Sequence, residues 1–385
     1  MKKLNRILAL LMVLVMVSAF TVACANDTTE PAETDTTTET AETTETVEET
    51  AEEPAEEATE ETTDEEPATA DGELSGTVAM ITDIGGINDE SFNQSAWMGL
   101  EEIGERGAEV SYIESQRDAD YPVNIETKIN EGNDLIWGIG FLMKNAVEKA
   151  ALDYPEQKFA LIDDVWEDGY LPNATGVTFA SEQSSFLVGY IASYMTETDR
   201  VGFILGMESP TMDRFKYGYF AGVDYGAAEQ GKEIQIDSVT VESFTDAALG
   251  KSTASKMYSD GADVIFHAAG NVGTGVIEAA KDADKWVIGV DLDQNHLAPD
   301  NVITSAMKNV NVATAELSVR ILNGEEVGGT TVHYGIEEGG VGIAPTSDKL
   351  VPADVLERTQ ALEDQMVAGE VVVPITEEEY NNFGN

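Results

Sequence analysis

The residues best suited to bind a small molecule lie in the stretch TDIGGINDESFNQS, residues 82–95. Asp83 offers a carboxylate, Asn93 an amide and Phe92 a flat aromatic ring. A carboxylate and an amide can hydrogen-bond sugar hydroxyls or the edge of a base, and a phenyl ring stacks on a flat ring. Because this stretch contains no Lys or Arg, it is poorly suited to bind a phosphate.

Residues of similar kinds follow directly after other apolar runs of the chain. They are Asp163 after FALI, Phe244 after VTVES, Gly270 after ADVIFHAA, Asp291 after WVIGV and Lys308 after VITSAM. Open parallel sheets bind ligands at the carboxyl ends of their strands, so this recurrence predicts one site built from many loops. Each residue type also has a structural interpretation, in which the acids cap helices, the rings belong to the core and the lysine lies on the surface.

The segments that position these residues are short apolar runs that alternate with longer helical stretches. The predicted strands cover residues 77–82, 109–113, 134–139, 158–162, 201–205, 235–241, 263–266, 287–290 and 302–305. The predicted helices cover residues 92–106, 145–153, 185–195, 214–230, 250–260 and 275–281. This alternation predicts parallel sheets in right-handed crossover units. We expect two lobes rather than one wide sheet, because residues 173–186 separate the first four strand-helix units from the rest.

Local chemistry explains how the first site stretch turns from a strand into a helix. Gly85 and Gly86 allow the backbone to turn sharply at the end of the strand. Asp89 or Ser91 can then cap the helix that begins near Phe92. The capping residue therefore stays undecided between these two.

The N-terminal region predicts export and anchoring. Residues 1–24 combine a charged start, an apolar run and small residues before Cys24, which is the pattern of a signal peptide. The ending TVAC resembles a bacterial lipobox, with Thr21 where that motif usually has Leu, and the resemblance implies that Cys24 carries a lipid. Residues 25–74 contain 20 Asp and Glu and no Lys or Arg, so they are predicted to form a disordered acidic linker.

Composition weakens or excludes several other classes of protein. The formal net charge of −52, with 21 Lys and Arg, argues against nucleic acid as a partner. Cys24 is the only cysteine, which excludes internal disulfides and Cys-based metal sites. The three histidines (His267, His296 and His333) lack the spacing of metal ligands, so we expect no metal and no cofactor.

Several motifs together resemble those of one known family. The run TDIGGINDESFNQSAWMGL, with KFALIDD, SEQSSFLVGYIA, SFTDAALGK and GVDLDQ, resembles the basic membrane protein family of bacterial lipoproteins. These are nucleoside-binding components of ABC importers, and the resemblance covers residues 75–375. It implies a type I periplasmic-binding-protein fold, an α/β architecture of two doubly wound parallel-sheet lobes joined by a hinge of three crossovers, with no catalysis.

The resemblance also implies the extent of each part of the chain. The N-terminal lobe is expected to contain residues 75–180 and 305–328, and the C-terminal lobe residues 181–304 and 329–375. The chain is then expected to cross between the lobes near residues 180, 305 and 328, and residues 376–385 form a tail.

The same resemblance assigns roles to the site residues. Asp83 and Asn93 hydrogen-bond a purine, and Phe92 stacks on one face of it. Phe244 is the ring expected on the other face, although two other aromatic residues compete for this role, Phe215 and Tyr217. The remaining residues surround the ribose: Asp163, Asp291 and Lys308 hold its hydroxyls, and Gly270 allows close backbone approach.

The function that follows is capture of a purine nucleoside, such as inosine, guanosine or adenosine, for an ABC transporter permease. The protein would be a monomer, not an enzyme, and anchored through Cys24 to the extracytoplasmic face of the cell membrane. One alternative keeps the fold and binds a sugar or other small polar solute. Another is a nucleotide-cofactor enzyme, since GNVGTG (270–275) is glycine-rich, but it lacks the G-x-G-x-x-G order. A receptor that feeds a sensor, or an adhesin, is a third.

Overall fold

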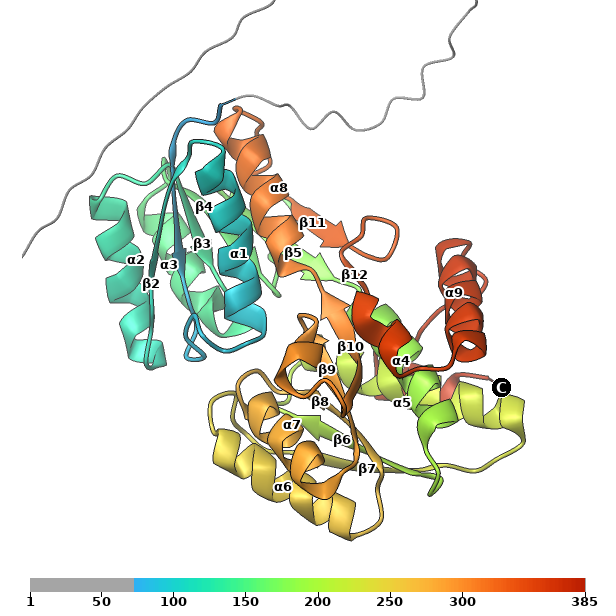
Figure 1. Ribbon diagram of the computed structural model, residues 1–385. Helices are drawn as coiled ribbons and strands as arrows, with labels where there is room; N and C mark the ends of the chain where they lie inside the picture. The colour runs from blue at the N-terminus through green and yellow to red at the C-terminus, as the bar shows by residue number, and fades with distance from the viewer. Residues whose placement is uncertain (1–72, 385) are drawn as a thin grey trace, which may run out of the picture. The chain divides into compact units, whose positions relative to one another are not determined.

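The computed structural model describes residues 73–384, which contain two six-stranded sheets with helices on both faces of each (Figure 1). The predicted signal peptide, Cys24 and all but the last two residues of the predicted linker lie outside the described residues. Within the described part of the chain, no helix is long and apolar enough to cross a membrane.

The first sheet is entirely parallel, with the strand order β11-β5-β4-β3-β1-β2. Its strands are β1 (Thr77–Ile81), β2 (Glu109–Ile113), β3 (Leu135–Gly138), β4 (Lys158–Ile162), β5 (Ala174–Phe179) and β11 (Thr331–Tyr334). Its helices are α1 (Phe92–Glu105), α2 (Tyr121–Asn130), α3 (Lys144–Asp153) and α8 (Val310–Leu322), with short 3₁₀ helices η1 (Asp118–Asp120) and η2 (Phe141–Met143). Met80 packs with residues of α1 and α8, and its neighbour Ile81 packs with residues of α2 and α3. Because both faces are covered, the central strands are apolar at successive positions.

The second sheet has the order β12-β10-β9-β8-β6-β7, and β12 is its one antiparallel strand. Its strands are β6 (Arg200–Leu205), β7 (Gln235–Thr240), β8 (Val264–Ala268), β9 (Trp286–Asp291), β10 (Val302–Lys308) and β12 (Val341–Ile343). Its helices are α4 (Ser181–Met195), α5 (Pro210–Gln230), α6 (Ala247–Ser259), α7 (Val272–Ala283), α9 (Ala353–Val367) and α10 (Glu377–Asn382), with 3₁₀ helices η3 (Gln294–Leu297) and η4 (Pro345–Lys349). Helices α4 and α5 cover one face, and α6 and α7 cover the other. Both sheets therefore repeat one winding pattern.

The chain passes between the two sheets three times, which confirms the predicted fold class of two doubly wound lobes with three crossovers. The first passage follows β5, the second separates β10 from α8, and the third separates β11 from β12. The predicted crossing near residue 305 falls inside β10, which stays paired with β9 as far as Met307. The predicted crossing near residue 328 precedes β11, which pairs with β5 in the first sheet. Strand pairing therefore corrects both of these boundaries.

Other differences from the sequence-based elements concern short or weakly patterned segments. The predicted elements leave out β5, β11 and β12, as well as helices α2, α8, α9 and α10. The predicted linker ends one residue too late, because Leu74 is buried and its backbone N–H donates to the Arg106 carbonyl at 2.7 Å. The predicted tail contains α10, whose Tyr380 hydroxyl donates to Asp224 on α5 at 2.6 Å. These C-terminal residues thus belong to the folded lobe.

Candidate ligand-binding site

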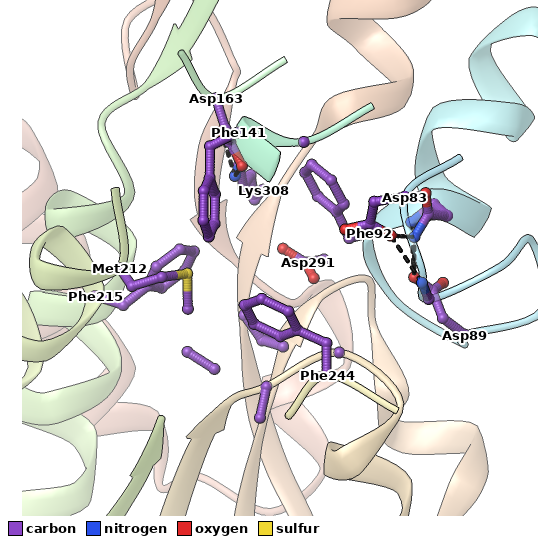
Figure 2. Close-up of a pocket in the computed structure, with 17 residues that line it drawn as sticks. Asp83, Asp89, Phe92, Phe141, Asp163, Met212, Phe215, Phe244, Asp291 and Lys308 are labelled. Carbon is purple, nitrogen blue, oxygen red and sulfur yellow. Dashed lines mark hydrogen bonds and ion pairs between the residues drawn. The ribbon is translucent and has the colours of Figure 1, made fainter. Parts of the chain in front are cut away.

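A pocket lies between the two lobes where the strands of both sheets end, and its cavity volume is about 50 Å³ (Figure 2). All eight residues predicted from the sequence line this pocket: Asp83, Phe92, Asn93, Asp163, Phe244, Gly270, Asp291 and Lys308. Asp83 and Asp163 follow β1 and β4 of the first sheet, whereas Asp291 and Lys308 end β9 and β10 of the second. The strand-end rule therefore brings residues that are up to 225 positions apart into one place.

The wall on the first lobe is a hydrogen-bonded group of three side chains, Asp83, Asp89 and Asn93, all buried. The Asn93 side-chain amide donates to Asp83 Oδ1 at 2.9 Å and to Asp89 Oδ2 at 3.0 Å. Asp89 also accepts from the backbone N–H groups of Ser91, Asn93 and Gln94. Asp89, rather than the Ser91 side chain, thus satisfies the first backbone donors of α1.

Two acceptor atoms on this wall have no protein donor in the described part of the chain. Asn93 Oδ1 is fully buried and unpartnered. Asp83 uses Oδ1 for the Gly85 N–H and the Asn93 amide, and Oδ2 accepts no hydrogen bond from a described residue. Burial raises the pKa of the Asp83 carboxyl to about 6 and also raises the pKa of Asp89. A ligand that donates hydrogen bonds would satisfy these acceptors.

Lys308 bridges the two lobes from the end of β10. Its Nζ lies 2.6 Å from Asp163 Oδ1, and the two side chains are only 2% and 7% exposed. The same ammonium lies 4.8 Å from the centre of the Phe92 ring and 5.1 Å from that of Phe179. Asp164, the acid next to Asp163, instead pairs with Lys144 at 2.7 Å. Asp163 is therefore the inward-facing acid of this pair, and the cation of the pocket is already neutralised.

Asp291 is the carboxylate of the second-lobe wall. Its Oδ2 accepts a short hydrogen bond from the Ser91 hydroxyl of the first lobe. Burial raises the pKa of the Asp291 carboxyl to about 7, although Lys308 and Ser91 act in the opposite direction. Both Asp163 and Asp291 have left-handed backbone conformations, with φ of 74° and 63°. Such conformations cost about 1 kcal/mol or more in a non-glycine residue, and they concentrate at functional sites.

Aromatic rings from both lobes surround the Asp291 carboxylate (Figure 2). They belong to Phe92 and Phe141 of the first lobe and to Phe215 and Phe244 of the second. The Phe244 ring lies over Gly206, where any Cβ would come within 2.2 Å of a ring carbon. Phe141 and Phe244 contact each other edge-on across the lobes, with centroids 6.2 Å apart. Both lobes thus offer rings on which a flat molecule can stack.

Several lining residues escaped the sequence-based prediction. Phe141 and Gly140 follow β3, so the strand-end rule applied to that strand would have found them. Met212 and Phe215 lie in the first turns of α5, after β6. Of the two rings named as competitors of Phe244, Phe215 lines the pocket and Tyr217 does not. The strand-end rule covers Gly140 and Phe141, whereas no pattern in the sequence singled out Met212, which lies inside α5.

The geometry is that of a binding pocket between two lobes. Among residues 73–384, no cluster of three His, Cys, Asp or Glu side chains could hold a metal ion. His267 lies outside the pocket, and burial lowers its pKa to about 3. Two doubly wound lobes with a pocket at their shared strand ends define the class of two-lobed solute-binding proteins with the periplasmic-binding-protein fold.

The chain belongs to the Bmp family, described as ABC transporter substrate-binding protein PnrA-like, whose model matches residues 76–377. It is 37% identical over 310 residues to basic membrane protein A1 of Borrelia garinii subsp. bavariensis, covering 80% of this chain and 90% of that protein. It is 35% identical over 318 residues to the ABC transporter nucleoside-binding protein BmpA of Lactococcus lactis subsp. cremoris, covering 77% and 88%. An ABC transporter solute-binding protein from Aeropyrum pernix has a similar structure, with a TM-score of 0.72, 28% identity and coverage of 80% and 95%. The resemblance inferred from the motifs is confirmed.

Proposed function

We propose that the protein captures purine nucleosides (inosine, guanosine or adenosine) outside the cytoplasm and delivers them to the permease of an ABC importer. It acts as a monomer held at the extracytoplasmic face of the cell membrane by a lipid on Cys24, and it releases its ligand chemically unchanged. Family membership supports the transport role. A relative named as a nucleoside-binding protein supports the ligand class.

The charge balance of the pocket carries the proposal. Carboxylates and phenyl rings line it, and Lys308 is the only Lys or Arg among its described lining residues. Because both carboxylate oxygens of Asp163 accept from that ammonium, little positive charge is left for a phosphate. The pocket therefore favours an uncharged molecule that combines a flat ring with hydroxyl groups, which is the chemistry of a nucleoside.

Each part of the nucleoside has a proposed partner. The base lies between the Phe92 and Phe244 rings, with its polar edge against Asp83 and Asn93. The ribose hydroxyls donate to Asp291, whose Oδ1 accepts no hydrogen bond from a described residue. The pair of Asp163 and Lys308 borders the same end, and Gly270, with φ of 54°, leaves room for the ligand.

Ligand capture is proposed to proceed by closure of the lobes about the three crossings. Several hydrogen bonds already join the lobes beside the pocket. The Thr211 hydroxyl donates to the Asp163 carbonyl at 2.9 Å, and the Gln294 amide donates to the Glu90 carbonyl at 2.8 Å. Closure would bury the ligand and present one defined surface to the permease. A decrease in the radius of gyration on ligand addition, measured by small-angle X-ray scattering, tests this step.

The ligand class is tested by denaturing the purified protein and identifying the released small molecules by mass spectrometry. Thermal unfolding is then measured with inosine, guanosine, adenosine, cytidine, ribose and guanosine monophosphate. A nucleoside at 100 times its dissociation constant should add about 2.7 kcal/mol to the free energy of unfolding. We expect stabilisation by purine nucleosides alone. Stabilisation by ribose or by the monophosphate, with no response to purine nucleosides, would contradict the proposal.

A further inference from the structure

The side-chain amide of Asn93 has a forced orientation. It lies between two carboxylates, and its Nδ2 donates one hydrogen to Asp83 Oδ1 and the other to Asp89 Oδ2, at 2.9 and 3.0 Å. Turning the amide over would place its oxygen against both carboxylates, so only one orientation is compatible with ionised acids. Figure 2 shows Asp83 and Asp89 at the same end of the pocket.

This orientation leaves only acceptors on that wall. Asn93 is 1% exposed, and its Oδ1 is a buried acceptor without a donor. Asp83 Oδ2 is the second unoccupied acceptor, and a Cβ on the neighbouring pocket residue Gly140 would lie only 3.2 Å from it. No N–H of Asn93 remains for a ligand. A buried unpartnered acceptor is costly, so the matching ligand is one that supplies hydrogens.

We propose that Asp89 is a specificity-determining positioning residue, which fixes the Asn93 amide so that the pocket prefers nucleosides of 6-oxopurines over adenosine. This inference rests on the proposed nucleoside function. Guanine offers N1–H and a 2-amino group on one edge, and hypoxanthine offers N1–H. Adenine presents an N1 lone pair beside its amino group, and that lone pair faces an acceptor. The order of affinity is then guanosine, inosine, adenosine.

Asp89 is suited to this role because its own hydrogen bonds leave it no freedom. Both of its oxygens accept from backbone N–H groups, those of Ser91, Asn93 and Gln94, so the carboxylate is locked to the start of α1. It contributes no atom that needs to touch the base. Its effect on the ligand passes through the Asn93 amide. Substitution of Asp89 should therefore change the selectivity between nucleosides, in addition to any loss of stability.

The test compares dissociation constants for guanosine, inosine, adenosine and purine riboside, measured by calorimetry at about pH 8, where Asp83 is ionised. The wild-type protein should bind guanosine at least about tenfold more tightly than adenosine, with purine riboside, which has no N–H on this edge, the weakest. Asp89→Asn should bring the guanosine-to-adenosine ratio to within about threefold, because an amide at position 89 can donate to a turned Asn93 oxygen and leaves Asp83 alone to hold the original orientation. Asp89→Glu should restore the preference.

Asp263→Asn is the matched control. Asp263 is also a buried carboxylate that accepts two backbone N–H groups and a threonine hydroxyl, but it does not line the pocket. Its substitution should lower stability and leave the nucleoside ratio unchanged. A ratio near one in the wild-type protein, or an unchanged ratio in Asp89→Asn, overturns the inference. If no nucleoside binds the wild-type protein, the proposed function fails and this inference falls with it.

A pH series on the wild-type protein gives a second readout that requires no variant. Protonated Asp83 can donate to the adenine N1, so the preference for guanosine should shrink between about pH 8 and about pH 5. The titratable groups that act on Asp83 are Asp89, Asp163 and Tyr121, and Lys308 stays paired with Asp163. Asp291 is proposed to bind the ribose, which all these ligands share, so its titration should not change the ratio of guanosine to adenosine affinity. A pH-independent ratio would contradict the assignment.

Discussion

The two walls of the pocket are built on different principles. The first-lobe wall is a chain of hydrogen bonds through Asp83, Asn93 and Asp89, which fixes the side chains and leaves two acceptors, Asn93 Oδ1 and Asp83 Oδ2, without a donor from a described residue. The second-lobe wall is mostly apolar, and Asp291 is its one acidic side chain. A preorganised polar surface decides which ligand fits, whereas an apolar surface contributes burial that favours many flat ligands alike. Selectivity and affinity are therefore expected to depend on different lobes.

The largest effect, a loss of stability, should come from breaking the Lys308–Asp163 ion pair, which joins the two walls. Lys308→Met leaves the Asp163 carboxylate buried without its partner, which should lower the free energy of unfolding by about 3–5 kcal/mol. Lys144→Met is the control, because the Lys144–Asp164 pair is about one-third exposed and should change stability by about 1 kcal/mol or less. Chemical denaturation of both variants measures the difference. Equal losses of unfolding free energy in the two variants would show that burial does not determine the contribution of the Lys308–Asp163 pair.

The next largest effect tests the carboxylate of the second wall. Asp291→Ala removes the proposed acceptor of the ribose hydroxyls, so the affinity for every nucleoside should fall by about 2–3 kcal/mol. Asp300→Ala removes an exposed acid shortly after η3 and should leave affinity unchanged. Isothermal titration calorimetry measures both. Wild-type affinity in Asp291→Ala would contradict the proposed role.

The aromatic rings sharpen the comparison between the lobes. Phe92→Ala and Phe244→Ala each remove a proposed stacking partner, and each should weaken binding by about 1–2 kcal/mol. Phe244→Ala should weaken binding of guanosine and adenosine equally, because its wall does not read the base edge. Tyr217→Ala alters a ring outside the pocket and should not affect binding. A change of selectivity in Phe244→Ala would show that the second wall also chooses the ligand.

The smallest expected effect is a dependence on pH. Burial raises the pKa of Asp291 from 3.8 to about 7, so stability from this group is present below about pH 4 and is lost as the pH rises through about 7. Nucleoside affinity should change in the opposite direction, by about tenfold between pH 6 and pH 8, because the ionised carboxylate accepts the hydroxyls. Calorimetry on the wild-type protein and Asp291→Asn isolates the contribution. A rise in affinity on acidification would contradict the assignment.

The fold and the position of the site could be predicted from the sequence because both depend on local patterns, namely apolar runs and the residues that directly follow them. Long apolar runs identified the central strands, and the residues directly after them line the pocket. Strands β11 and β12 have only four and three residues, and pairing at a sheet edge rather than apolar pattern stabilises them. That is why the crossing near residue 328 was misplaced, whereas the crossing near residue 305 was misplaced because β10 extends to Lys308.

Contacts between distant residues are what the sequence could not supply. Lys308 was expected to hold ribose hydroxyls, and the sequence could not show that it also pairs with Asp163, which is 145 positions away. Asp89 was considered only as a helix cap, and its second role depends on how the Asn93 amide turns in three dimensions. The binding roles of the eight lining residues stay predictions until ligand measurements test them.

The location of Lys308 has a mechanical consequence. It ends β10 one residue before the chain returns to the first lobe, and its ammonium lies beside Phe179, which ends β5 at another crossing. If the lobes open about the three crossings, as proposed, residues beside the crossings move least, so the Lys308–Asp163 ion pair would persist in the open state. The Lys308 ammonium would then stay neutralised by Asp163 in both the open and the closed state. A phosphorylated compound would meet only uncompensated carboxylates in either state.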